Sequence, residues 1–115
     1  MIIELSGKEY EIAKSLRVAF EMQKDFGKLP YMKIFEEITD RPLEDQIKMI
    51  YVAFRIKNPN VMTKDEFIDL VLDEWTLDGV WDVINKLMNA ITGKKDKEPT
   101  EVEEEKTTEQ QEKKS

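Results

Sequence analysis

Four carboxylates in the second half of the chain are the first residues whose type and spacing could do chemistry. Asp73-Glu74, Asp78 and Asp82 lie close together, and carboxylate oxygens are the ligands that Ca²⁺ prefers. A Ca²⁺ loop of the EF-hand type needs oxygen ligands at alternate positions from the first residue onward, with glycine at the sixth. Counting from the first of these acids, Trp75 occupies the third position, so the pattern fails. We interpret the four residues as acids at the start of a helix, where the helix dipole favours negative charge.

Two further pairs of acids, Glu36-Glu37 and Glu44-Asp45, could supply carboxylates for general acid and base catalysis. Their spacing does not distinguish them from the solvated faces of ordinary helices, which is the interpretation that we adopt. The chain has no His and no Cys, which excludes an imidazole base, a thiol nucleophile, a disulfide and the common zinc sites. Its four glycines are not clustered into a phosphate-binding loop. We therefore predict a protein that is not an enzyme and has no catalytic, metal or cofactor site.

The charge balance limits the kinds of molecule that the chain could bind. The chain has 18 Lys and Arg against 25 Asp and Glu, a formal net charge of −7. An acidic chain is a poor ligand for nucleic acid, because phosphate binding depends on clustered Lys and Arg. The sequence has no apolar run long enough to span a membrane, and its start, with early acids and no long apolar run, predicts that it is not a signal peptide. We expect a cytoplasmic protein that binds neither nucleic acid nor a membrane.

The composition changes after Gly93. Residues 94–115 comprise 22 positions, of which 14 are charged, and Val102 is their only large apolar residue. Such a segment cannot bury enough apolar surface to offset the entropy of ordering its backbone. We predict one domain, residues 1–93, followed by a disordered charged tail, residues 94–115. Without the tail the domain has 12 basic and 17 acidic residues, so it is acidic by itself, with a net charge of −5.

Turn signals and apolar periodicity predict the elements of this domain. Apolar residues alternate with charged ones on either side of Ser6-Gly7, which predicts a β-hairpin over residues 2–12. Five helices are then expected, beginning near Ser15, Tyr31, Pro42, Thr63 and Leu77. Asp40 is a plausible cap for the third helix, Thr63-Lys64-Asp65-Glu66 matches a capping box, and Gly93 is placed to end the fifth helix. The predicted fold is mainly α, with an N-terminal β-hairpin packed on a compact bundle of about five helices.

The third expected helix, residues 43–57, is apolar on nearly all sides. Leu43, Ile47, Ile50, Tyr51 and Phe54 form one stripe, and further apolar residues fill much of the opposite side. A helix of this kind is usually buried on all sides. We therefore expect this helix to be the structural centre of the domain.

Four apolar residues are candidates for a partner-binding groove. The third helix has more apolar faces than a small bundle readily covers, and the first helix adds two residues beyond its main stripe. Flexible Met side chains on an exposed groove would accept varied helical ligands. One hypothesis is therefore a partner groove that involves Met22, Phe26, Met49 and Ile56. The alternative is that all four belong to an ordinary core.

The order of segments along the chain resembles a known family. The start Ile3-Glu4-Leu5-Ser6-Gly7-Lys8-Glu9-Tyr10-Glu11-Ile12 leads into a helix that ends Lys24-Asp25-Phe26-Gly27. Ile47 to Phe54, Asn58-Pro59-Asn60 and Thr63-Lys64-Asp65-Glu66 follow, and a last helix rich in Trp and Leu precedes the charged tail. Over roughly residues 2–92 this order resembles the tail assembly chaperones of long-tailed bacteriophages and of related prophages of Gram-positive hosts.

This resemblance implies a non-enzymatic assembly factor in the host cytoplasm. Members of the family bind the long helical tape measure protein, keep it soluble and help the tail tube protein to assemble around it. Family genes often also yield a longer product by ribosomal frameshifting. The alternative function is a generic acidic helical adaptor or regulatory binding module, including a mimic of nucleic-acid charge. Steep salt dependence of binding would indicate a mimic, whereas a chaperone groove should bind an amphipathic helix with little salt dependence.

Overall fold

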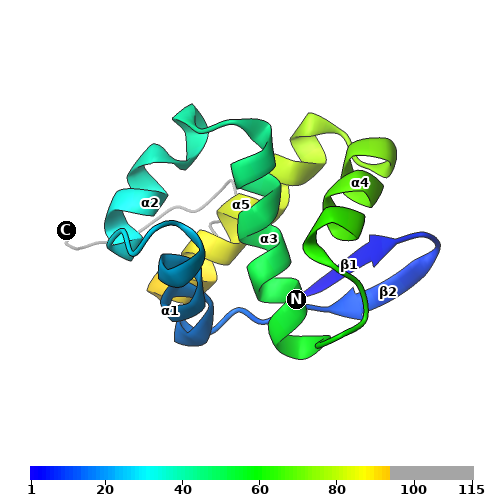
Figure 1. The fold of residues 1–115 in the computed structure, drawn as a ribbon, viewed down its shortest axis with the longest axis horizontal. Helices are drawn as coiled ribbons and strands as arrows, with labels where there is room; N and C mark the ends of the chain where they lie inside the picture. The colour runs from blue at the N-terminus through cyan, green and yellow to red at the C-terminus, as the bar shows by residue number, and fades with distance from the viewer. Residues whose placement is uncertain (94–115) are drawn as a thin grey trace, which may run out of the picture.

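The chain begins with a small antiparallel sheet and continues as helices (Figure 1). The computed structural model describes residues 1–93, and the tail predicted for residues 94–115 lies outside this range. The elements are β1 (Ile2–Leu5), β2 (Lys8–Glu11), α1 (Leu16–Asp25), α2 (Tyr31–Glu37), the short 3₁₀ helix η1 (Ile38–Asp40), α3 (Leu43–Lys57), α4 (Lys64–Glu74) and α5 (Leu77–Thr92). The predicted fold class, mainly α with an N-terminal hairpin and five helices, is confirmed.

The hairpin forms because its turn residues accept a left-handed backbone. Ser6 and Gly7 have φ values of 53° and 76°, as a two-residue turn that matches the twist of the strands requires. This turn sets the register, in which Ile3 lies opposite Tyr10. Ile3 and Leu5 are buried, so one face of the hairpin is part of the core, as a stable two-stranded sheet requires.

Local signals determine several helix ends. In the predicted capping box of α4, Glu66 N–H donates to Thr63 Oγ1 at 3.1 Å, and Thr63 N–H donates to Glu66 Oε1 at 2.8 Å. The fifth helix ends at Gly93, whose φ of 85° is left-handed, as predicted. The expectation that Asp40 caps α3 is wrong. Asp40 belongs to η1, and Pro42 precedes the first residue of α3 without a side-chain cap.

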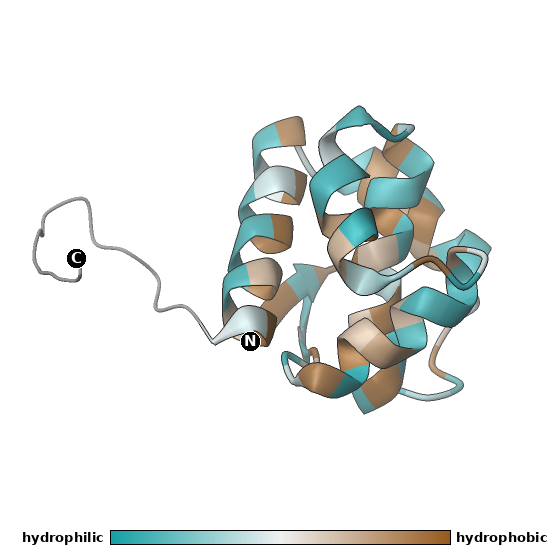
Figure 2. Cartoon of the chain, turned by 90° about the vertical axis from the view of Figure 1, so that its left-hand side faces the viewer, coloured by the Kyte–Doolittle hydropathy of each residue, from teal (hydrophilic) through white to brown (hydrophobic). Residues whose placement is uncertain are grey.

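Helix α3 is the centre of the molecule. Figure 1 shows α1 and α2 on one side of it, α4 and the hairpin on the other, and α5 crossing behind it. Figure 2 shows brown, hydrophobic positions on the sides of the helices that face one another. The ring of Phe54 is fully buried, with centroids 4.9 Å from Phe67 and 5.3 Å from Tyr10. The buried residues of α3 are Gln46, Ile47, Met49, Ile50, Val52, Ala53 and Phe54.

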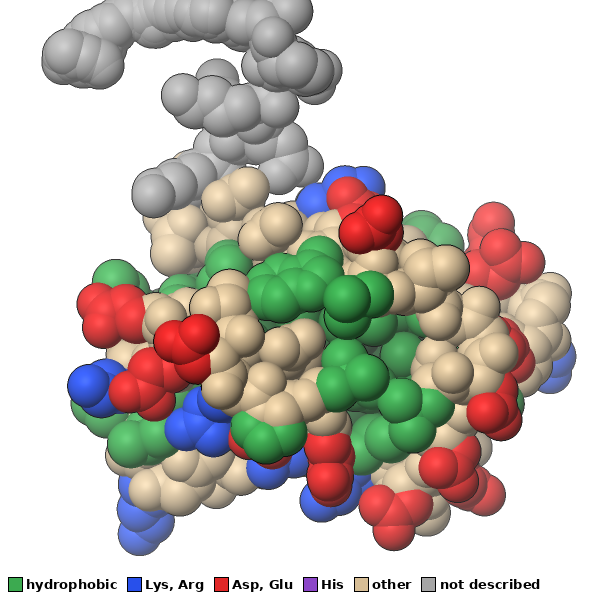
Figure 3. Space-filling model, turned by 90° about the horizontal axis from the view of Figure 1, so that it is seen from above, with side chains coloured by type: hydrophobic (Ala, Val, Ile, Leu, Met, Phe, Trp, Pro, Cys, Tyr) green, Lys and Arg blue, Asp and Glu red, His purple; other side chains and the backbone are tan. Residues whose placement is uncertain are grey.

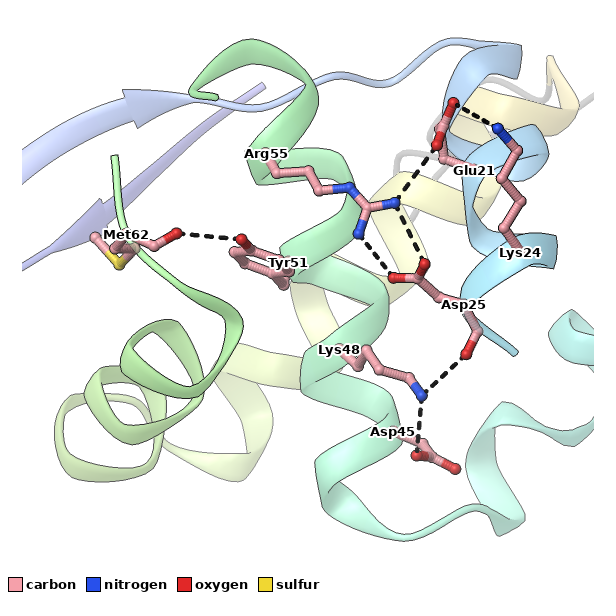
Figure 4. Close-up of polar contacts among 8 residues, drawn as sticks. All are labelled: Glu21, Lys24, Asp25, Asp45, Lys48, Tyr51, Arg55 and Met62. Carbon is pink, nitrogen blue, oxygen red and sulfur yellow. Dashed lines mark hydrogen bonds and ion pairs between the residues drawn. The ribbon is translucent and has the colours of Figure 1, made fainter. Parts of the chain in front are cut away.

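A polar network joins α1 to α3 on the surface (Figure 4). Arg55 Nη1 lies 2.8 Å from Asp25 Oδ2, and Arg55 Nη2 lies 3.5 Å from Glu21 Oε1. Lys48 Nζ donates to the carbonyl oxygen of Asp25 at 3.2 Å. Partial burial lowers the pKa of Arg55, but the hydrogen bond and the charge of Asp25 raise it more, so it lies above its ordinary value. The network therefore holds the C-terminal end of α1 against α3 through a permanent positive charge.

Candidate partner-binding groove

The four residues of the predicted partner groove do not form an exposed surface. Met22 and Met49 are fully buried and Phe26 is nearly so, all three within the hydrophobic core. Ile56 is partly buried and packs against that core, at the margin of a shallow hollow beside Arg55. The structure therefore agrees with the alternative, an ordinary core, for three of the four. A binding surface has to be sought among the apolar residues that stay exposed.

The acids first considered for calcium belong to two different helix ends. Asp73 and Glu74 close α4, whereas Asp78 lies in the first turn of α5 and Asp82 in the next. The interpretation as helix-start acids is thus right for Asp78 and wrong for Asp73 and Glu74. Glu74 instead accepts hydrogen bonds from the backbone N–H of Ser6 at 2.8 Å and from its hydroxyl at 3.1 Å. Within residues 1–93, no group of three or more His, Cys, Asp or Glu residues could hold a metal ion.

In each of the two acid pairs considered for acid and base catalysis, the second carboxylate is engaged by neighbouring cations. Glu37 lies 3.4 Å from Lys33 and 3.8 Å from Arg41. Asp45 lies 2.9 Å from Arg41 and 3.9 Å from Lys48. In each of these four ion pairs, the two residues are three or four positions apart in sequence. This is the arrangement of solvated helix faces, as the sequence suggested.

Three exposed leucines converge where three helix ends meet. Leu43 begins α3, Leu72 lies near the end of α4 and Leu77 begins α5, and their exposed fractions are 39%, 52% and 60%. Between them is a crevice of about 90 Å³, room for one aliphatic side chain. We call this surface the leucine groove, and its lining is Leu43, Ile47, Val71, Leu72, Trp75, Thr76, Leu77 and Val80. Figure 3 shows the face over these helix ends, with hydrophobic side chains gathered across its middle.

The start of α3 is held in place by a buried amide. Gln46 Nε2 donates to the carbonyl oxygens of Ile38 and Arg41, each at 3.1 Å. The bond to Arg41 gives a backbone acceptor of the turn between η1 and α3 a partner, and the bond to Ile38 adds to the one that its carbonyl oxygen accepts from Arg41 N–H at 3.3 Å. The ion pair between Arg41 and Asp45 closes the same turn. The position of Leu43 at the groove therefore follows from a rigid turn rather than from a mobile loop.

Hydrogen bonds of Trp75 and Thr76 hold the junction between α4 and α5 in place. Trp75 has an extended backbone that ends α4, and its indole Nε1 donates to the carbonyl oxygen of Glu4 in β1 at 3.0 Å. Thr76 Oγ1 accepts a hydrogen bond from Gly79 N–H at 3.1 Å and so caps α5. Leu72 and Leu77 project from the two sides of this fixed junction. The backbone on either side of the junction is thus fixed before a partner binds, which lowers the entropic cost of binding.

Negative charge surrounds the groove. The three leucines of the groove, Leu43, Leu72 and Leu77, are each followed directly by an exposed acid, namely Glu44, Asp73 and Asp78 respectively. Among the described residues, none of these three carboxylates has a Lys or Arg within ion-pair distance. In Figure 3, Asp and Glu side chains lie at the margins of the hydrophobic area. The groove therefore combines an apolar floor with a rim that favours a positively charged partner.

Comparisons with known proteins were made for the whole chain. They found no match to a protein-family model, to a curated protein or to a solved structure. In the part of the chain that the structure describes, no helix has both the length and the apolar composition needed to cross a membrane.

The leucine groove was missed from the sequence, although a signal for it was present. Leu43, Leu72 and Leu77 read as members of the apolar stripes of three separate helices, and stripes of this kind usually face the core. The repeated step from a leucine to an acid, at the two ends of predicted helices, was the available signal. This signal could be recognised as a site only once the structure showed that the three helix ends lie together. At the groove itself the chain can bind an apolar side chain and a neighbouring cation at the same time.

Proposed function

We propose that this chain is a non-enzymatic tail assembly chaperone, acting in the host cytoplasm, and that its leucine groove binds a helix of the tape measure protein. The order of segments resembles that family, and the groove supplies a surface suited to the task. The observation that carries the proposal is the convergence of Leu43, Leu72 and Leu77 on one rigid apolar crevice with an acidic rim. Assistance to the tail tube protein is part of the same proposal and follows from the resemblance alone.

The physical basis is the matching of apolar surfaces. A long helical protein that has not yet been enclosed by its tube exposes apolar stripes, and these drive aggregation. An amphipathic helix laid across the groove would cover such a stripe, with one side chain in the crevice between the three leucines. Each Å² of apolar surface removed from water contributes about 25 cal/mol before the costs of association. The net charge of −7 would then keep the resulting complexes apart in solution.

The test uses two leucines in equivalent local positions. Leu77 is the first residue of α5, after its cap Thr76, and Leu16 is the first residue of α1, after Ser15. Their exposed fractions are 60% and 69%, so a glutamate at either position stays in water and lies favourably in the first turn. Leu77→Glu and Leu16→Glu should therefore fold alike, and only the first alters the groove.

Each variant is co-expressed with the tape measure protein of the same genome, and the soluble fraction is purified through a tag on the chaperone. The expected result is that Leu16→Glu keeps the tape measure protein soluble and co-purifies it, as the native chain does, whereas Leu77→Glu does neither. Retention by both variants would exclude the groove as the binding surface. A tape measure protein that stays soluble without the chain would contradict the proposed function itself.

The salt dependence of binding distinguishes the chaperone from the alternative function, an acidic regulatory module that mimics nucleic acid. Binding through a largely apolar groove should weaken only modestly between 50 and 200 mM salt, whereas binding through displaced counterions would fall by roughly 10³-fold or more. A steep loss of the complex over this range would favour the alternative.

A further inference from the structure

The outer edge of β1 has backbone groups that no other group in residues 1–93 binds. Along an antiparallel hairpin, residues whose backbone groups bond to the other strand alternate with residues whose backbone groups do not. With the two-residue turn and this register, Ile3, opposite Tyr10, is a residue of β1 that bonds to β2. The backbone groups of Ile2 and Glu4 therefore point away from β2. The bond from Trp75 Nε1 to the Glu4 carbonyl oxygen, at 3.0 Å, lies on this outer side. The N–H and C=O of Ile2 and the N–H of Glu4 have no partner in the described part of the chain.

This edge is held firmly at the end nearest the turn. Besides the Trp75 bond, the carboxylate of Glu74 accepts hydrogen bonds from Ser6 N–H at 2.8 Å and from Ser6 Oγ at 3.1 Å. The hairpin is thereby attached to the end of α4 by three hydrogen bonds. A segment that pairs with β1 would not have to order the strand first, so the entropic cost of binding is reduced. A fixed strand with unpaired N–H and C=O groups is a template for strand addition.

A pocket of about 500 Å³ lies beside this edge, between β1 and α5. Its volume is within the range of sites that hold small ligands. A Cβ at Gly79, which lines the pocket, would meet only Thr76 Oγ1, at 3.4 Å. The space beside this residue is therefore empty, and the glycine leaves it open because it has no side chain. The wall opposite β1 is the first half of α5, and the lining used below is Ile2, Glu4, Trp75, Gly79, Asp82 and Val83. Ile2 is exposed, whereas Trp75 and Val83 are partly buried.

The charge of the pocket indicates what it would accept. Glu4, Glu74 and Asp82 line it, and no Lys or Arg does. Asp82 already has a partner outside the lining, because Lys86 Nζ lies 3.1 Å from its Oδ2. Glu4 is exposed and has no ion pair among the described residues. Its carboxylate, next to the unpaired backbone groups, is therefore available to a cation on an incoming chain.

We propose that the outer edge of β1 binds an extended segment of a partner protein in which Lys or Arg alternates with apolar residues. The backbone of this segment bonds to Ile2 and Glu4, and continues the sheet. Since successive side chains of a strand point to opposite faces, the basic residues lie beside Glu4 while the apolar residues lie against Val83 and Trp75. The site is separate from the leucine groove, with which it shares only the wall formed by Trp75 and Thr76, and it does not rest on the proposed function.

The test titrates the full 115-residue chain with an acetylated and amidated heptapeptide of alternating lysine and valine. Amide hydrogen exchange, measured by NMR, reports each strand separately. The expected result at saturation is slowing of exchange by about tenfold or more at Ile2 and Glu4, with no change at the opposite strand. The control peptide has the same side chains and methyl groups on every backbone nitrogen, so it keeps the charge but cannot pair as a strand. Equal binding of the methylated peptide, or unchanged exchange at Ile2 and Glu4, would overturn the proposal.

A matched pair of charge reversals locates the site. Glu4 in β1 and Glu36 in α2 are both exposed, neither has an ion pair among the described residues, and only Glu4 lines the pocket. Glu4→Lys should raise the Kd of the peptide by about tenfold, since it replaces an attraction by a repulsion, and Glu36→Lys should raise it by less than about threefold. A second variant, Gly79→Leu, fills the pocket while improving the helix propensity of α5, and should abolish binding. Equal effects of the two reversals, or full binding by Gly79→Leu, would show that the peptide binds elsewhere.

Discussion

Replacement of Phe54 by alanine is the most direct test of the role of α3. The Phe54 side chain is fully buried, and its ring lies 4.9 Å from that of Phe67 and 5.3 Å from that of Tyr10, measured between centroids. These three aromatic side chains come from α3, α4 and β2. The substitution therefore removes the contact at which the helices and the hairpin meet.

The expected cost follows from this burial. Truncation of a fully buried Phe to Ala costs about 3–5 kcal/mol, because apolar area is lost and a cavity remains. The two close aromatic contacts place Phe54→Ala in the upper part of this range. Small domains have a total stability of about 5–15 kcal/mol, so the variant should be close to unfolding at 37 °C. For a domain of this length, each kcal/mol lowers the thermal midpoint by about 4–8 °C.

The measurement is urea-induced unfolding followed by far-UV circular dichroism, with the slope of the transition compared between variants. Phe20→Ala is the matched control, because Phe20 lies on α1 with an exposed fraction of 51%. Its ring is covered by Lys24 Nζ at 4.8 Å and by the guanidinium of Arg17 at 5.5 Å, contacts worth about 0.5–1 kcal/mol at an exposed site. The control should therefore lose about 1–2 kcal/mol at most.

A loss of less than about 1 kcal/mol for Phe54→Ala, or a loss equal to that of the control, would refute the reasoning. It would mean that the Phe54 side chain is not enclosed in solution, and that α3 presents this face to a partner instead of to the core.

Two further predictions concern the chain end and the polar network. A chain shortened to residues 1–93 should keep its thermal midpoint within a few degrees in calorimetry, because the removed segment has one large apolar residue, and a loss of cooperative unfolding would contradict the domain boundary. In a double-mutant cycle, Asp25→Asn and Arg55→Met should show a coupling of about 1 kcal/mol in urea unfolding, since Arg55 makes two contacts with the same carboxylate, at 2.8 and 3.3 Å. Arg55→Lys should not restore this coupling, because one ammonium group cannot reproduce a two-pronged contact. Full restoration by Lys would show that charge alone is responsible.

Sequence signals that act over a few residues predicted the fold well. The turn at Ser6-Gly7, the capping box that begins at Thr63 and the left-handed end at Gly93 all occur as expected. Each depends on the conformational preference of one residue or on a hydrogen bond between residues three positions apart. The failure at Asp40 has the same local character, because the following Pro42 occupies the cap position itself and the segment before it forms a 3₁₀ helix.

Contacts between residues far apart along the chain could not be predicted from the sequence. The bond from Trp75 to Glu4 joins residues 71 positions apart, and the bonds from Ser6 to Glu74 join residues 68 apart. No periodicity encodes such pairs, since each partner lies on an element whose own pattern is complete without the other. These bonds nevertheless attach the hairpin to the end of α4 and fix the junction that lies between Leu72 and Leu77.

The sequence by itself determined that the domain is acidic, helical and preceded by a hairpin, and that its third helix is central, because composition and periodicity state which faces must avoid water. It did not determine which apolar residues are left over after packing. Met22 and Met49 had the types expected of a binding surface and are buried, whereas Leu43, Leu72 and Leu77 had the pattern of a core and are exposed. Only the tertiary structure decided this, because a side chain at a helix end is covered or left open according to how closely neighbouring helix ends approach it, and that distance depends on the whole bundle.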